Sequence, residues 1–351
     1  MIHELITLAR STGTPLIEGN TAVFVWQGQQ APALIGDFTD WEEAPLPLNR
    51  IAPAVWVHRL TLPPGAYLEY SFYADGQRVA DPLNPRTSSD GFGHRNHWFY
   101  MPPGAPTPLA TRQPKTPRGV VTRHLLPTND LAVGRQRTVF LYRPPCDEPC
   151  PLLVVYDGPD YLRRARLPVI VDNLIAQGRI RPLAMALLAN GHQARLLEYG
   201  CNEMTVAFLL ESVLPLARAT LNLQEARSEA DGSYGIMGAS MGGLMALYTA
   251  LRLPHLFSRV LSQSGAFSLG GNDLIVYDLV RQFRPLPLKI WMDVGLFEGL
   301  LQANRRMHAL LDERGYAPAY REYPAGHNYP AWRDDLWRGL EYLFPPIAPS
   351  L

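Results

Sequence analysis

The sequence predicts an α/β protein in which a small all-β domain precedes a larger domain of alternating strands and helices. Residues 21–100 contain short β-branched and aromatic runs between Gly-, Pro- and Asp-rich turns, which favours a small β-sandwich. From residue 120 onward strand-like and helix-like segments alternate, which is typical of a mostly parallel sheet covered on both faces. A Gly-x-Ser-x-Gly turn at residues 238–242 stands between an expected strand and an expected helix.

A change in composition marks the boundary between the two patterns. Residues 101–119 are rich in proline, cannot form a regular element and indicate a semi-rigid linker. We therefore expect a β-sandwich domain at 1–100, the linker at 101–119 and the α/β domain at 120–351. With 351 residues, of which 47% are hydrophobic, the chain is long enough for two domains with full cores.

The first domain is expected to open with a short helix and a turn at residues 1–20. Its expected strands are 22–26, 33–36, 55–60 and 68–73. Residues 81–98 predict a long polar loop with two glycines, and loops of this length are often functional. The cationic side chains of this loop would either reach the second domain or belong to a solvated connection: Arg86, His94, Arg95 and His97.

The second domain is expected to open with an antiparallel pair of strands, 120–125 and 137–142. The later expected strands are 151–156, 183–188, 233–237, 259–264, 288–294 and 319–323. Helices are expected at 167–177, 203–221 and 241–252, and residues 301–311 also have a helical pattern.

The turn at 238–242 predicts a nucleophile elbow, in which a serine sits on a sharp strand-to-helix turn. Side chains would collide at the flanking positions, so Gly238 and Gly242 are the residue types that this turn needs. Ser240 would then project above the sheet as the nucleophile. The N–H of Met241, at the start of the helix, would point at a developing oxyanion.

A serine nucleophile needs a base, and the base needs an orienting acid. Two histidines follow Ser240: His308 lies in a helical pattern and is expected at the surface, whereas His327 lies in the loop after the last long strand. We predict His327 as the base. Glu298 lies beyond the carboxyl end of the strand at 288–294 and is the predicted acid, with Asp293 inside that strand as the alternative.

The first hundred residues resemble the immunoglobulin-like early-set modules of glycogen-branching enzymes, glycogen-binding proteins and some esterases. The motifs that carry this resemblance are Gly36-Asp37-Phe38-Thr39-Asp40-Trp41, 55–57, 64–72 and Asp81-Pro82-Leu83-Asn84-Pro85. The resemblance implies an immunoglobulin-like sandwich. In sugar-binding members exposed tryptophans stack on glucose rings, so Trp41 and Trp56 would either bind sugar weakly or pack in the core. We favour packing.

The second domain resembles the esterase D and enterochelin esterase group of α/β-hydrolases over residues 120–345. The matching motifs, in the same order as in that group, are 155–158, 171–178, 195–199, 238–243, 262–267, 295–298 and 326–328. The resemblance implies an α/β-hydrolase fold and a serine carboxylesterase that acts through an acyl-enzyme, with Ser240, His327 and Glu298 as its triad. Mycobacterial mycolyltransferases are relatives with the same elbow, so acyl transfer to an alcohol stays open.

One position departs from the pattern of this group. The second oxyanion donor commonly follows an Asp-Gly or His-Gly pair, but here that residue is Pro159, which has no N–H. The alternatives are the N–H of Gly158, the N–H of Asp160 and the hydroxyl of Tyr161, and we favour Gly158.

The expected substrate-binding residues are Asp160, Tyr161, Arg195, Phe267 and Trp332. Together with Arg195, the arginines of 163–166 would either attract an anionic substrate, such as a catecholate siderophore, or form a solvated helix face. Phe267 and Trp332, with Tyr329, would either line an aromatic pocket or pack in the core.

The overall composition limits the partners. Thirty-two basic residues balance 32 acidic ones, which argues against a nucleic-acid or anionic-membrane partner. No apolar run could span a bilayer and the first residues do not resemble a signal peptide, so a cytoplasmic location is expected. Cys146, Cys150 and Cys201 are expected to be free thiols, and no metal or other cofactor is expected.

The sequence thus predicts an enzyme whose partner is a small-molecule ester. Two alternatives stay open: a carbohydrate-binding protein with an inert hydrolase domain, and an acyltransferase. Chain-length preference and oligomeric state are not predicted.

Overall fold

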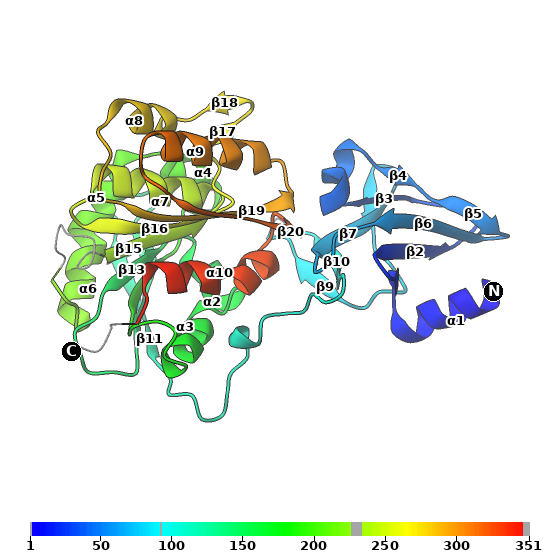
Figure 1. Cartoon of the computed structure of the whole chain (residues 1–351), viewed down its shortest axis with the longest axis horizontal. Coiled ribbons are helices and arrows are strands. Elements are labelled where there is room, and N and C mark those ends of the chain that lie inside the picture. Colours follow the sequence, from blue (N-terminus) through cyan, green and yellow to red (C-terminus); the bar gives the residue numbers. More distant parts are fainter. Residues whose placement is uncertain (1, 92, 226–233, 347–351) are drawn as a thin grey trace. The chain divides into compact units, whose positions relative to one another are not determined.

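The computed structural model describes residues 2–91, 93–225 and 234–346 (Figure 1). The chain divides into two compact units. The first unit is Met1–Ala105 together with two later segments, Gly295–Gly299 and Glu322–Ala331. The second unit comprises Pro106–Val294, Leu300–Arg321 and Trp332–Leu351.

Two antiparallel sheets build most of the first unit. One sheet has the order β1-β2-β6-β5. In the other, β7 pairs with β3, β8 and β10, while β4 pairs with β3 and β9 pairs with β10. The strands are β1 (Leu16–Glu18), β2 (Thr21–Gln27), β3 (Ala33–Gly36), β4 (Leu46–Pro47), β5 (Asn49–Ala52), β6 (Val55–Thr61), β7 (Tyr67–Ala74), β8 (Gln77–Val79), β9 (Thr87–Ser89) and β10 (Arg95–Tyr100). Short 3-10 turns, η1 (Asp37–Thr39) and η2 (Trp41–Glu43), follow β3.

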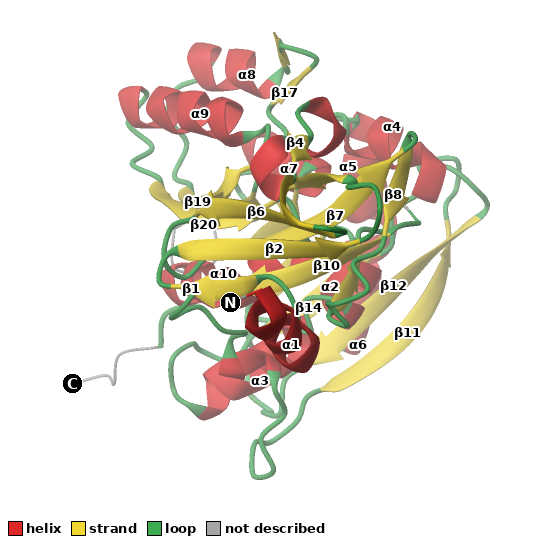
Figure 2. Cartoon of the chain, turned by 90° about the vertical axis from the view of Figure 1, so that its right-hand side faces the viewer, coloured by secondary structure: helices red, strands yellow, loops and turns green. Residues whose placement is uncertain are grey.

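Strand β2 is buried on both faces because its residues alternate between two clusters. Phe24 contacts Tyr70 and Phe99 of the other sheet edge-on, with ring centroids 4.9 and 5.7 Å apart. Val23 and Val25 belong to a second cluster with Ala9 of α1 (Ile2–Thr12), the helix that lies beside β1 and β2 in Figure 2. The period of two along a strand therefore places one set of side chains between the sheets and the other under the helix.

The prediction of a loop across residues 81–98 is wrong for residues 87–89, which form β9, and for residues 95–98. Residues 95–98 belong to β10, which pairs with β7 and β9. The side chains of Asn96 and His97 are buried in this arrangement. Cross-strand pairing thus outweighs the polar composition that indicated a loop. Phe92, in the same stretch, lies outside the described residues.

The second unit is built on a mixed sheet with the strand order β11-β12-β14-β13-β15-β16-β19. Strands β11, β12 and β14 pair antiparallel, and the pairs from β14 to β19 are parallel. The bounds are β11 (Val120–Pro127), β12 (Gln136–Arg143), β13 (Leu152–Val155), β14 (Ala184–Leu188), β15 (Tyr234–Ala239), β16 (Phe257–Gln263) and β19 (Lys289–Phe297). A small hairpin, β17 (Ser268–Leu269) with β18 (Asn272–Asp273), follows β16, and β20 (Ala319–Gly326) is the last strand.

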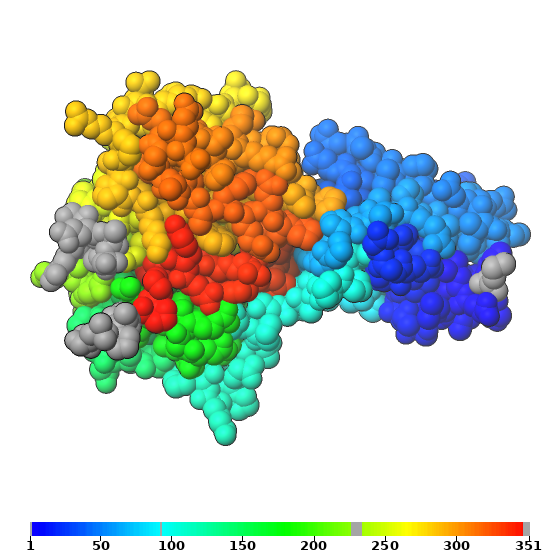
Figure 3. Space-filling view, in the orientation of Figure 1, coloured from blue at the N-terminus to red at the C-terminus, as the bar shows by residue number. Residues whose placement is uncertain are grey.

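Helices cover both faces of this sheet. They are α2 (Gly158–Arg163), α3 (Leu167–Ala176), α4 (Arg195–Tyr199), α5 (Glu203–Phe208), α6 (Leu214–Thr220), α7 (Met241–Arg252), α8 (Val276–Gln282), α9 (Leu301–Glu313) and α10 (Tyr329–Leu343), with 3-10 turns η3 (Pro108–Ala110) and η4 (His192–Ala194). Leu152 and Val154 of β13 belong to one core cluster with residues of α5 to α9, whereas Leu153 and Val155 are equally buried but lie outside that cluster. Residues of α9 and α10, orange and red in Figure 3, form part of the surface of this unit.

These elements confirm the predicted fold class of an N-terminal β domain followed by an α/β fold. The single helix expected at 203–221 is a continuous helical run that contains a π-helical stretch, η5 (Leu209–Val213), between α5 and α6. The strand expected from Ser233 begins at Tyr234, and Ser233 itself lies outside the described residues.

Candidate active site

Ser240 occupies a sharp turn between β15 and α7. Its backbone has φ 58° and ψ −123°, a conformation that is strained for a residue with a Cβ. A Cβ added to Gly238 would overlap the backbone of Gly242. Gly238 is therefore needed because the strand and the helix approach each other more closely than a side chain allows, whereas a Cβ at Gly242 would lie 3.2 Å from Oδ2 of Asp157.

Neighbouring segments fix the strained turn through its backbone. The N–H of Ser240 donates to the carbonyl of Gln263 at 2.9 Å, and the carbonyl of Ser240 accepts from Ala266 at 3.0 Å and from Leu244 at 3.1 Å. Gln263 ends β16, the parallel neighbour of β15. Backbone strain persists where the surroundings over-determine it, and such positions are common at active sites.

Two backbone N–H groups near this turn are the first of their helices. Met241 begins α7, and Gly158 begins α2 directly after Asp157 in a left-handed conformation (φ 55°). The first N–H groups of a helix have no intrahelical acceptor, so both remain available to an oxyanion. The other candidates are engaged: the N–H of Asp160 donates to the Asp157 carbonyl, and the hydroxyl of Tyr161 donates to Gln263 at 3.0 Å.

Arg195 is held by the carboxylate that precedes Gly158. Its guanidinium donates to both oxygens of Asp157, at 2.9 and 2.6 Å, and to the carbonyl of Ala239 at 3.3 Å. The Asp157 side chain is only 1% exposed, and the side chain of Asn190 also donates to it. Arg195 therefore joins the turn after β13 to the last residue of β15, instead of presenting an unpaired charge to a substrate.

His327 and Glu298 form a hydrogen-bonded pair within the first unit. The Nδ1 atom of His327 bonds to Oε2 of Glu298, and Oε1 of Glu298 accepts from the N–H of Gly295 at 2.5 Å. The Glu298 side chain is 1% exposed, whereas that of His327 is 36% exposed. The carboxylate of Glu298 is thus shielded from water, whereas the imidazole of His327 remains accessible to solvent.

Asp293, the alternative acid, has other partners. It is fully buried at the end of the paired part of β19, where its Oδ2 accepts from Trp291 at 2.8 Å and from Gln263 at 3.4 Å. Between the two carboxylates, the geometry therefore favours Glu298 as the partner of His327.

The predicted aromatic lining is mostly buried. Phe267 is in the core cluster, Trp332 donates its indole N–H to Ser264 at 2.9 Å, and Tyr161 has no exposed surface. These environments favour the packing alternative for Phe267 and Trp332, as they do for Tyr329, which is 7% exposed. Asp160 is half-buried, and burial raises the pKa of its carboxyl, with Arg164 opposing that effect at 3.6 Å.

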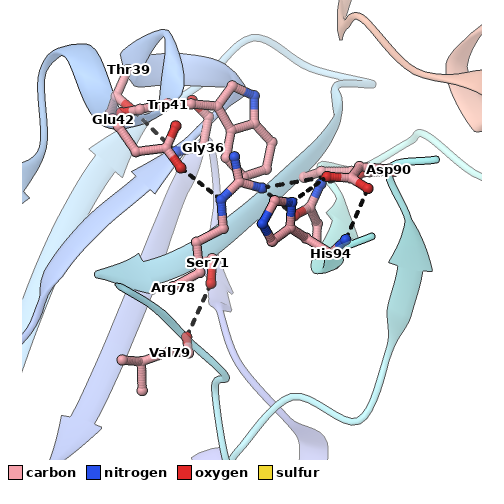
Figure 4. Close-up of polar contacts among 11 residues, drawn as sticks. Gly36, Thr39, Trp41, Glu42, Ser71, Arg78, Val79, Asp90 and His94 are labelled. Carbon is pink, nitrogen blue, oxygen red and sulfur yellow. Dashed lines mark hydrogen bonds and ion pairs between the residues drawn. The ribbon is translucent and has the colours of Figure 1, made fainter. Parts of the chain in front are cut away.

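The candidate sugar-binding tryptophans of the first unit also have partners. The guanidinium of Arg78 lies over the ring of Trp41, 4.4 Å from its centroid, and donates to Glu42 at 2.7 Å (Figure 4). The indole N–H of Trp56 donates to the Gly28 carbonyl at 2.9 Å. At least one face of Trp41 is therefore covered by a cation, which favours a structural role.

Of the cationic residues in 81–98, two bond within the domain and two are exposed at the surface. His97 accepts from the N–H of Asp81 through Nε2 at 2.8 Å and bonds to the Asn84 carbonyl through Nδ1, so it holds its own segment together. Arg86 donates to Asn84 and to the Thr14 carbonyl. Arg95 and His94 are exposed and bond to Thr87 and Asp90.

His308, expected at the surface, stacks on Tyr320 with ring centroids 4.3 Å apart. No group of three or more His, Cys, Asp or Glu side chains arranged to hold a metal ion occurs among residues 2–91, 93–225 and 234–346. Within the same ranges, none of the helices combines the length and the apolar character needed to cross a membrane.

Sequence reasoning missed one group around His327. Asp37, Gly326 and Asn328 lie together, with the amide of Asn328 3.5 Å from Oδ2 of Asp37 and no room for a Cβ at Gly326. Asp37 belongs to a motif that the sequence singles out, but its proximity to His327 depends on a contact between residues far apart in the chain.

The parallel sheet and the strained serine turn define an α/β-hydrolase-type fold. Residues 131–343 match the model of the family described as "Putative esterase", and the chain belongs to this family of esterases.

The names of similar proteins state an activity more specific than that of the family. The chain is 28% identical over 281 residues to an iron(III) enterobactin esterase of Escherichia coli O6:H1, covering 77% of this chain and 68% of that protein. It is 27% identical over 307 residues to an iron(III) salmochelin esterase of the same organism, covering 81% and 73%. The crystal structure of ferric enterobactin esterase from Salmonella typhimurium superimposes with a TM-score of 0.77 at 23% identity, covering 94% of this chain and 95% of that one, and shows the same fold.

Proposed function

We propose that this esterase is a serine carboxylic-ester hydrolase that works through an acyl-enzyme, with Ser240 as nucleophile, His327 as base and Glu298 as acid. The observation that carries the proposal is the strained conformation of Ser240 between β15 and α7, in a chain that also pairs His327 with a buried carboxylate. The order Ser, Glu, His along the chain is the order of α/β-hydrolases.

In the proposed mechanism, Oγ of Ser240 attacks the ester carbonyl while Nε2 of His327 accepts its proton. Glu298 holds the Nδ1 proton of His327 and stabilises the imidazolium that forms. The tetrahedral intermediate then collapses, and the alcohol leaves with the proton from Nε2. A water molecule, activated by His327 in the same way, attacks the acyl-enzyme and releases the acid.

The N–H groups of Met241 and Gly158 are the proposed oxyanion donors. The strands before them, β15 and β13, are parallel neighbours, so the turns that follow them lie at the same edge of the sheet. Each such donor contributes on the order of 10²–10³ in kcat in a related mechanism. This arrangement supplies two donors although Pro159 removes the usual one.

We propose a siderophore ester as the substrate class. The support is the similarity to enterobactin and salmochelin esterases at 27–28% identity. Two arginines at the end of α2 and beyond, Arg163 and Arg166, are exposed and would attract an anionic catecholate. We also propose that the N-terminal β domain is of the immunoglobulin-like early-set type, on the motif resemblance and its two antiparallel sheets.

The experiment is hydrolysis of p-nitrophenyl acetate by the wild-type chain and by Ser240→Ala. We expect Ser240→Ala to lose nearly all activity with little change in the thermal unfolding midpoint, because the substitution removes only the nucleophile. Retained activity would refute the nucleophile assignment. An inactive wild-type chain that binds glycogen would favour a carbohydrate-binding protein, and product formed on an added alcohol in preference to hydrolysis would favour an acyltransferase.

A further inference from the structure

Three carboxyl groups of the first unit gather around the segments that carry His327 and its acid. Asp37 in η1 is 7% exposed, Glu69 in β7 is 2% exposed, and the side chain of Glu298 is 1% exposed. Tyr67 and Asn96 bond to Glu69 at 3.0 and 2.9 Å. This carboxyl cluster (Asp37, Glu69, Glu298) is not explained by the proposed mechanism, which uses Glu298 alone.

Asp37 contacts the turn that carries His327 on both sides of that residue. A Cβ added to Gly326 would overlap the carboxyl group of Asp37, so the backbone before His327 packs directly against it. The side-chain amide of Asn328 lies 3.5 Å from Oδ2 of Asp37, while its oxygen accepts from the N–H of Ala331 at 3.0 Å. Asn328 thus joins Asp37 to the first turn of α10.

Asp37 is itself fixed by the β domain. Its Oδ2 accepts the backbone N–H of Glu69 at 2.8 Å. The preceding Gly36 lies so close to the Glu69 carbonyl that a Cβ would not fit. The Asp37 side chain is thus fixed to β7 and contacts residues 326 and 328. It is therefore well suited to hold the turn at these residues in one position.

The protonation state of Asp37 follows from its surroundings. Burial raises the pKa of its carboxyl well above the ordinary value, and the nearby charges of Glu69 and Glu298 raise it further, against the N–H of Glu69, which lowers it. The raised pKa favours the uncharged form of the Asp37 carboxyl, and an asparagine can take its place as an acceptor.

We propose that Asp37 is a positioning residue, which holds the Gly326–Asn328 turn and through it the imidazole of His327 in the orientation that bonds to Glu298. The inference rests on the proposed function of His327. It gives the N-terminal β domain a part in catalysis that differs from sugar binding. Asp37 would then affect kcat through the position of His327, without touching the substrate.

The test compares Asp37→Ala and Asp37→Asn in the full chain by kcat, KM and the pH profile of kcat/KM on p-nitrophenyl acetate. We expect Asp37→Ala to lower kcat at least about tenfold with little change in KM, because a turn that moves by even a small distance misplaces the base. Asp37→Asn should restore most of kcat and keep the wild-type midpoint of the acid limb, because the raised pKa of Asp37 favours an uncharged carboxyl, which the amide replaces.

Matched controls separate positioning from general destabilisation. Asp81 is a buried carboxyl of the same β domain that bonds to Thr14 and Tyr70 at 2.6 Å, and Asp81→Asn should leave kcat within about threefold of wild type. Gly326→Ala should reduce kcat as Asp37→Ala does, whereas Gly299→Ala should not, because a Cβ at Gly299 meets no atom within 4 Å.

Two results would overturn the inference: a folded Asp37→Ala variant with kcat within about threefold of wild type, or an Asp37→Asn variant as impaired as Asp37→Ala. If Asp37→Ala does not fold, Asn328→Asp replaces it, since this substitution keeps the acceptor for Ala331 and removes the amide beside Asp37. A folded Asn328→Asp variant with unchanged kcat would also overturn it. Retained activity in Ser240→Ala would refute the proposed function instead, so the two failures are distinguishable.

Discussion

Glu298 and Asp293 are close in sequence but bind different partners. Glu298 bonds to His327 through one oxygen and to the backbone of Gly295 through the other, so both of its acceptors help to orient the imidazole. Asp293 bonds to the side chains of Trp291 and Gln263 inside the second unit. A triad acid acts by fixing the tautomer and stabilising the imidazolium, which requires direct contact with the histidine.

Glu298→Gln should therefore lower kcat by about 10²–10⁴-fold, because the amide can present the wrong hydrogen-bonding group to Nδ1. Asp293→Asn should have a much smaller effect on kcat and act mainly on stability. Steady-state kinetics of the two variants, side by side with their unfolding midpoints, check this. A larger loss of kcat in Asp293→Asn would transfer the role of the acid to Asp293.

Residue types alone predicted the nucleophile turn and left the acid open. Gly238 is needed by the local backbone of the turn, so this part of the pattern is visible in the sequence. The choice between Glu298 and Asp293 depends on where each side chain points after β19, and no local propensity specifies that. The burial of Phe267 and Trp332 likewise depends on tertiary packing, which is why the sequence left pocket and core as equal alternatives.

At the scale of elements, the turn after β13 is built around the Asp157–Arg195 pair. The pair is bidentate, and it links α4 to the first residues of α2 and the last residue of β15. The sequence predicted these strands and the serine turn, but it treated Arg195 as a candidate anion ligand. The bond to Asp157 could not be predicted because an arginine in a helix has no sequence signal for a buried aspartate in another element.

Arg195→Ala should destabilise the fold and reduce kcat together, because it leaves Asp157 buried without its partner and loosens the turn at Gly158. Removal of one partner of a buried pair typically costs about 3–5 kcal/mol, and the low end applies here since Arg195 is partly exposed. Arg163→Ala, at an exposed position, should change neither stability nor kcat on a neutral ester. Denaturant unfolding with kinetics measures both, and an Arg195→Ala variant of wild-type stability would contradict the structural role.

At the scale of the whole molecule, the chain divides into two compact units, neither of which is continuous in sequence. Ser240 belongs to the second unit, whereas Gly295–Gly299 and Glu322–Ala331, which carry Glu298 and His327, group with the N-terminal β domain. The fold class was predictable because strand and helix periods are local. The grouping of these two late segments with the N-terminal β domain was not predictable. It depends on contacts such as that of Asp37 with Asn328, which are far apart in the chain.

The raised pKa of Asp37 also predicts how stability depends on pH. Its native pKa lies above the unfolded value of about 3.9, so between these values the native state binds more protons and stability falls as pH rises. The substitution Asp37→Asn removes the titrating carboxyl, so the variant lacks this decrease in stability with rising pH. The difference in unfolding midpoint, variant minus wild type, should therefore become more positive from about pH 4 to pH 7. A difference that is constant or falls over this range would contradict a raised pKa of Asp37 in the folded protein.

Covalent labelling is the most direct test of Ser240 as the nucleophile. The chain would be treated with a fluorophosphonate and the adduct located by mass spectrometry of its peptides. We expect one label on Ser240, no label in Ser240→Ala, and slower labelling in Glu298→Gln, because a poorly oriented His327 activates the hydroxyl less well. A label on another residue, or continued ester hydrolysis by a chain that is not labelled at Ser240, would contradict this assignment of the nucleophile.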